Sequence, residues 1–99
     1  MLKPGVKLNG IKPEICIAIM IANNVYLSNG YTFTLTSICD GKHGRASLHY
    51  PGLAFDCRTR DLPSESEKKN IADQIRNALG EEFDVILHST HIHVEFQPK

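Results

Sequence analysis

Ser47-Leu48-His49-Tyr50-Pro51-Gly52-Leu53-Ala54-Phe55-Asp56 is the stretch of the chain that decides its fold. A helix would hold His49 and Asp56 two turns, about 10 Å, apart, but Pro51-Gly52 breaks any helix between them. A loop histidine and a strand aspartate can instead converge, and Ala54 leaves room on the strand face of the aspartate. Imidazole nitrogen and carboxylate oxygen suit zinc, although an unrelated surface histidine and strand aspartate would produce the same pattern.

A second stretch, residues 91–96, places two more histidines near the C-terminus. In an extended strand His91, His93 and Glu95 share one face, while the alternate apolar residues point into the core. This alternation favours a metal ligand over two titrating surface histidines. Spacing leaves open which histidine binds the metal, and the other would then donate hydrogen bonds or carry protons. Three protein ligands leave a fourth position open, as in catalytic zinc sites.

The bulk composition limits the class of protein. With 99 residues the chain is expected to form a single domain, residues 1–99. Eleven basic and eleven acidic residues give a net charge near zero, which argues against nucleic acid or an anionic membrane as the main partner. The oligomeric state is not encoded in any recognisable pattern.

Cysteine spacing and leader composition indicate where the chain is made. The chain has three cysteines, Cys16, Cys39 and Cys57, and none of them forms a CxxC pair. An odd number without paired spacing predicts reduced thiols rather than a disulfide framework. The apolar run 15–22 is too short to span a bilayer and does not resemble a secretory signal. We therefore expect synthesis in the cytoplasm without a signal peptide.

Local patterns predict an α+β fold with a small antiparallel sheet packed against two helices. The first helix runs from Pro13 to the stop signal Asn29-Gly30, and its apolar middle predicts a central core helix buried on nearly every side. The second follows a capping box in which Ser64 is the N-cap and Glu67 reaches back, and ends at Gly80. Strands are expected at residues 31–37, 52–58, 83–87 and 92–96, with the last two joined by a hairpin around residues 89–90.

The motif S-x-H-x-x-G-x-A-x-D followed by H-x-H resembles the zinc D-alanyl-D-alanine carboxypeptidases and endopeptidases, which share a fold with the hedgehog signalling domain. The likeness is greatest to short, phage-type members and extends over nearly the whole chain. It includes residues 2–6, 40–43, 47–50, 56–62 and 83–96.

The resemblance implies a hedgehog/DD-peptidase-like fold and a specific site. It implies that His49, Asp56 and His93 bind Zn2+, and that His91 donates to the transition state. Ser47 matches the motif serine that braces the site by hydrogen bonding.

A polar loop precedes the motif serine. His43 and Arg45 lie in this loop, where a cation could hold a carbonyl or carboxylate oxygen of the substrate. Together with Ser47, these residues are the expected substrate-binding side of the site.

One position departs from the family pattern. Members of the family place a glutamate a few residues before H-x-H as the general base, and this chain has His88 there. His88 is then a substitute base, a fourth ligand that closes the site, or a mark of lost activity. Glu95, two residues beyond His93 on the same face, is a weaker candidate for the base.

The resemblance implies a zinc peptidase that cuts peptidoglycan stem peptides next to a D-amino acid or a small residue. Without a leader, such an enzyme would reach the cell wall by another route, as phage lysis proteins do. The alternative is a zinc-binding module of the same fold that binds a cell-wall peptide or a partner protein with little or no turnover. A third hypothesis is that no metal binds.

Overall fold

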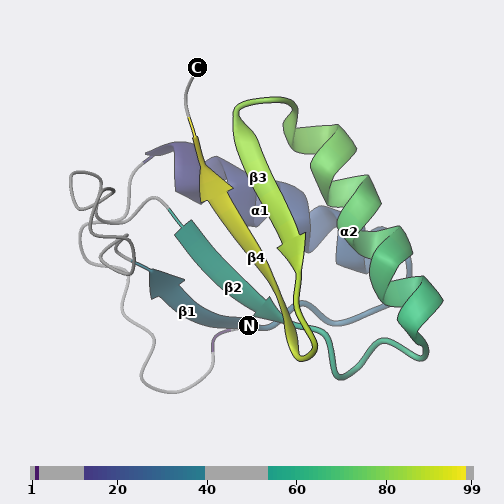
Figure 1. Cartoon of the computed structure of the whole chain (residues 1–99). Helices are drawn as coiled ribbons and strands as arrows, with labels where there is room; N and C mark the ends of the chain where they lie inside the picture. Colours follow the sequence, from purple (N-terminus) through teal and green to yellow (C-terminus); the bar gives the residue numbers. More distant parts are fainter. Residues whose placement is uncertain (1, 3–12, 40–53, 98–99) are drawn as a thin grey trace.

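A computed structural model describes residues 2, 13–39 and 54–97 of the chain (Figure 1). In chain order the elements are α1 (Pro13–Ser28), β1 (Leu35–Cys39), β2 (Ala54–Arg58), α2 (Glu65–Leu79), β3 (Phe83–Leu87) and β4 (His91–Phe96). The strands form one antiparallel sheet in the order β1-β2-β4-β3. The predicted α+β class, with two helices packed on an antiparallel sheet, is confirmed in the described residues.

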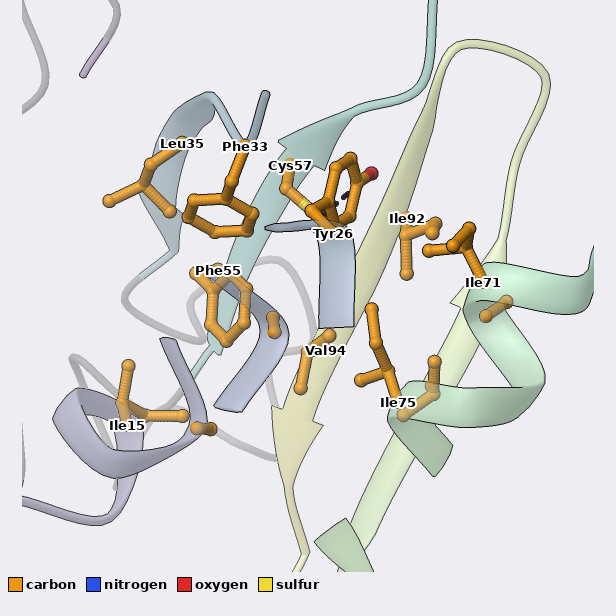
Figure 2. Packing of buried hydrophobic residues seen from close by; sticks show 14 of the residues in the cluster. Ile15, Tyr26, Phe33, Leu35, Phe55, Cys57, Ile71, Ile75, Ile92 and Val94 are labelled. Carbon is orange, nitrogen blue, oxygen red and sulfur yellow. Dashed lines mark hydrogen bonds between the residues drawn. The ribbon is translucent and has the colours of Figure 1, made fainter. Parts of the chain in front are cut away.

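Both helices pack on one face of the sheet and enclose a single hydrophobic cluster (Figures 1 and 2). The strands contribute alternate residues to this face, because successive side chains of a strand point to opposite sides. In β2 and β4 these residues are Phe55, Cys57, Ile92 and Val94, all of which are fully buried. The intervening residues of the same strands therefore point away from the helices.

The register of the two central strands aligns both sets of side chains. Phe55 pairs with Val94 on the inner face, and Asp56 pairs with His93 on the outer face. Cys57 faces the core as the alternation predicts, and burial raises the pKa of its thiol to about 12. This cysteine is therefore a core residue rather than a reactive group beside Asp56.

The first helix is buried on one side only, which corrects the prediction of a helix surrounded by core. Ile15, Ala18, Ala22 and Tyr26 are completely buried against the sheet and α2, since they recur at helical spacing along one face. The opposite face exposes Ile17 (57%), Met20 (69%) and Leu27 (57%). The apolar run alone could not show this, because it places apolar residues on both faces of the helix.

Tyr26 joins α1 to the sheet through its hydroxyl group. Its Oη donates to the carbonyl oxygen of Arg58 at 2.8 Å and lies 3.6 Å from Cys57 Sγ (Figure 2). Burial is the main cause of the raised pKa of this phenol. A buried polar group needs such a partner, so the hydrogen bond sets where α1 lies along β2.

The second helix begins and ends as predicted, but its capping box is only half formed. The Glu67 backbone N–H donates to Ser64 Oγ at 3.1 Å, and Gly80 ends the helix with a φ of 88°. The carboxylate of Glu67 accepts hydrogen bonds from Tyr31 and Asn70 instead of reaching back to the N-cap. A tertiary contact has replaced the local one.

The boundaries of β1 and β4 differ from the predictions. The strand expected at residues 31–37 runs from Leu35 to Cys39, and its register with β2 shifts between Leu35 and Ser37. This irregularity places Ser37 opposite Asp56. The strand expected at 92–96 begins one residue earlier, at His91. Of the strand expected at 52–58, the described part is β2, Ala54–Arg58, and residues 52–53 lie outside the described ranges. The hairpin is confirmed, with the His88 N–H donating to the His91 carbonyl oxygen at 2.8 Å across Ser89-Thr90.

No helix in the described ranges has the length and apolar character needed to cross a bilayer.

The one-sided burial of α1 predicts opposite outcomes for the same substitution two residues apart. Ile15→Ala should lower the free energy of unfolding by about 2–5 kcal/mol, because it leaves a cavity in the core. Ile17→Ala should change it by less than about 0.5 kcal/mol, because Ile17 is exposed and alanine favours helix. Urea unfolding followed by circular dichroism measures both. Equal losses in the two variants would contradict the observed orientation of α1.

Candidate metal centre on the outer face of the sheet

The residues that carry the predicted chemistry lie on the sheet face opposite the helices. Alternation along β4 places His91, His93 and Glu95 on this outer face, and alternation along β2 places Asp56 beside them. The core therefore holds the two strands together without occupying the face that carries the site. The sequence predicted that the three β4 residues share one face. The pairing of β2 with β4 places Asp56 on the same face.

Asp56 and His93 are in direct contact. His93 Nδ1 lies 2.7 Å from Asp56 Oδ1, and both side chains are about four-fifths buried. Ser37 Oγ donates to the second carboxylate oxygen at 3.1 Å, and Thr36 Oγ1 donates to the Asp56 carbonyl at 3.2 Å. The neighbouring strand thus fixes the position of the carboxylate from its other side.

Ser37 and Thr36 were not among the predicted site residues. In the sequence they end a stretch in which threonine alternates with aromatic or aliphatic residues, a pattern typical of any half-buried strand. Their contact with Asp56 depends on the register shift in β1, which brings Ser37 opposite Asp56. A serine within a strand carries no sequence signal for this role.

His91 lies at the edge of the same cluster. Its Nε2 is 3.9 Å from Asp56 Oδ1, and its Nδ1 is 3.2 Å from the hydroxyl oxygen of Thr90. About one third of the side chain is exposed, compared with 18% for His93. The two histidines therefore differ: His93 Nδ1 is the nitrogen nearer to the carboxylate, and the His91 side chain is the more exposed of the two.

His88 joins this group through the hairpin. Its ring stacks on the His91 ring with centroids 4.7 Å apart, and its centroid lies 6.4 Å from that of His93 in an edge-on arrangement. The short turn brings residues 88 and 91 opposite each other. The histidine at the position of the expected base thus lies within the imidazole cluster, where proton transfer to or from a bound molecule is geometrically reasonable.

The imidazoles set the charge state of the carboxylate. Burial raises the pKa of Asp56, but hydrogen bonding to His93 and the charges of His93 and His91 lower it by more. The hydrogen bond from Ser37 acts in the same direction. The net result is a pKa below the ordinary value of 3.8, so the carboxylate is ionised at neutral pH, as a metal ligand must be.

Glu95 forms the opposite wall of the cluster. Its Oε1 lies 3.1 Å from His93 Nε2, so the two nitrogens of that ring each face a carboxylate. Gln97 Nε2 donates to the other oxygen of Glu95. The sequence placed Glu95 on the correct face but did not indicate its contact with His93.

Four predicted residues lie outside the described ranges: His43, Arg45, Ser47 and His49. The structure therefore brings together Asp56, His88, His91 and His93. Within the described part of the chain, no group of three or more potential ligands is arranged to hold a metal ion. The predicted ligand set includes His49, so this finding does not test zinc binding.

The donors that are described fit zinc in chemistry. Carboxylate oxygen and imidazole nitrogen are both common zinc ligands, with bonds of about 2.0–2.2 Å. Asp56 Oδ1 and His93 Nδ1 lie 2.7 Å apart, so these two donors are close enough together to hold one ion. The third position would fall to His49.

Comparison of the chain with protein-family models, with curated proteins and with solved structures returned no match. The resemblance to the D-alanyl-D-alanine peptidases therefore stays a prediction.

The lowered pKa of Asp56 predicts a specific loss of stability in acid. The Asp56 carboxyl binds a proton less tightly in the native state than in the unfolded state, so the ionised carboxylate stabilises the fold. This contribution to the free energy of unfolding is present above pH 3.8 and is lost as the pH falls through the pKa of Asp56 in the native state. In chelator-treated protein, Asp56→Asn should abolish this part of the pH dependence. Urea unfolding between pH 6 and pH 2 measures it, and an unchanged slope in the variant would contradict the assignment.

Proposed function

We propose that the chain is a zinc-dependent peptidase that acts on the stem peptides of bacterial peptidoglycan. The observation that carries the proposal is the convergence of the Asp56 carboxylate with the imidazoles of His91 and His93 on a sheet face free of core packing. Two of the three proposed ligands, Asp56 and His93, are in contact here, and carboxylate oxygen and imidazole nitrogen are the donors of hydrolytic zinc centres.

The fold we propose is that of the hedgehog/DD-peptidase group. An antiparallel four-stranded sheet with two helices on one face is the arrangement that the resemblance implied. The motif residues lie in agreement with it, since Asp56 is in one central strand and H-x-H is in its neighbour.

His49, Asp56 and His93 would hold the ion. When bound, zinc would supply Lewis-acid polarisation of the scissile carbonyl and would acidify a water molecule. Ser37 Oγ keeps the Asp56 carboxylate in place by donating a hydrogen bond to Oδ2, the oxygen that does not contact His93. His43, Arg45 and Ser47 remain the proposed contacts to the substrate backbone and carboxylate.

The two remaining histidines have different proposed roles, one in stabilising charge and one in proton transfer. His91 turns Nε2 toward Asp56, where its N–H can stabilise negative charge developing on the substrate oxygen. His88 would take the proton of the attacking water in place of a glutamate, because imidazole carries protons efficiently near neutral pH. Their stacked rings keep both groups on the same side of the site.

The proposed site of action is the cell wall. The substrate bond would be next to a D-amino acid or a small residue. Neither nucleic acid nor a membrane is proposed as a partner, because the net charge is near zero.

A second candidate function is a zinc-binding module with little or no turnover. The stacking of His88 on His91 favours it, because a third imidazole close to the pair offers a fourth protein ligand that would close the site. The two candidates differ in whether one coordination position stays open.

Digestion of purified peptidoglycan tests the proposal. Zinc-loaded protein without a histidine tag should release new amino termini, detected by mass spectrometry. His88→Ala should lower the rate by about 10²–10⁴-fold, because a general base typically contributes that much. Ser89→Ala, in the exposed turn beside it, is the matched control and should keep the wild-type rate.

The same assay separates the two candidates. Activity that appears only in His88→Glu, with none in the wild type, would favour the non-catalytic module. Metal analysis of the purified wild type is a separate measurement, and less than about one equivalent of zinc per chain would contradict both candidates.

A further inference from the structure

We infer that Glu95 is a positioning residue that presents the Nδ1 atom of His93 to the metal. This inference rests on the proposed function, because it concerns the ion that His93 would hold. It goes beyond that function by assigning a role to Glu95 and by naming the ligating nitrogen.

The inference starts from the two carboxylates around one imidazole ring. Asp56 Oδ1 is 2.7 Å from His93 Nδ1, and Glu95 Oε1 is 3.1 Å from His93 Nε2. A neutral imidazole has one N–H and can donate to only one of these acceptors. A cation that takes the place of the proton between His93 and Asp56 lets the neutral ring satisfy both sides, with Nε2–H donating to Glu95.

Glu95 is itself held in position. Gln97 Nε2 donates to its second oxygen, and the backbone N–H of Gln97 donates to the Glu82 carbonyl at 2.6 Å. Because hydrogen bonds engage both carboxylate oxygens, Glu95 serves as a fixed acceptor for His93. This is a different role from the general base that the sequence left open for it.

The same contact distinguishes the two histidines of H-x-H. His91 Nδ1 has the neutral hydroxyl of Thr90 beside it, whereas His93 Nε2 has a carboxylate. A carboxylate that accepts from a ligating histidine fixes its tautomer and raises its basicity. The pair is therefore asymmetric, and its stronger electron donor is His93, the less exposed member.

Metal affinity tests this role without relying on turnover. Glu95→Gln keeps the size of the side chain but removes its charge, and should weaken zinc binding about 10–100-fold in a competition titration with a chromogenic chelator. Asp84→Asn is the matched control. Asp84 is the exposed cross-strand neighbour of Glu95, so this variant removes the same charge one strand away and should keep the wild-type affinity.

Nuclear magnetic resonance of the histidine rings supplies a second readout. In zinc-loaded protein labelled with ¹⁵N, two-bond proton–nitrogen spectra should show His93 with a protonated Nε2 and a metal-bound Nδ1. A residue with a merely structural role would not determine which nitrogen carries the proton.

Each outcome decides the inference. Zinc bound through Nε2, or equal affinities for Glu95→Gln and Asp84→Asn when the wild type binds zinc, would overturn the role of Glu95 and leave the proposed function standing. A wild-type chain that binds no zinc would overturn both.

Discussion

The pairing of β2 with β4 is the constraint on which the site and the core both depend. One register places Phe55 beside Val94 under the helices and Asp56 beside His93 on the opposite face. A slip of one residue would turn the carboxylate and the imidazoles into the core and expose the apolar residues, at a large cost in burial free energy. Hydrophobic packing of the inner face therefore fixes the geometry of the polar outer face.

The polar face adds a second level of organisation. Asp56 is held by Ser37 on one side and His93 on the other, and His93 is held in turn by Glu95. The hydrogen bonds cross from β1 through β2 to β4, so three strands contribute to the position of one imidazole. Groups fixed in this way lose little entropy when a ligand binds, which would suit the metal centre that we propose.

Local signals predicted those features that depend only on nearby residues. Pro13, the N-cap at Ser64 and the glycines after both helices act on their own turn of backbone, so the helix limits were predictable. Contacts between distant segments were not. Glu67 exchanged its predicted local contact for Tyr31, and the β1 register shift that brings Ser37 to Asp56 has no sequence signature.

The sequence by itself determined the α+β class, the hairpin and the sharing of one strand face by His91, His93 and Glu95, because periodicity of two or 3.6 residues is a local property. Only the tertiary structure decided that α1 buries one of two apolar faces and that Asp56 meets His93. Both depend on which elements become neighbours. That choice is made by the burial of the whole core, because no short stretch of chain encodes its distant partner.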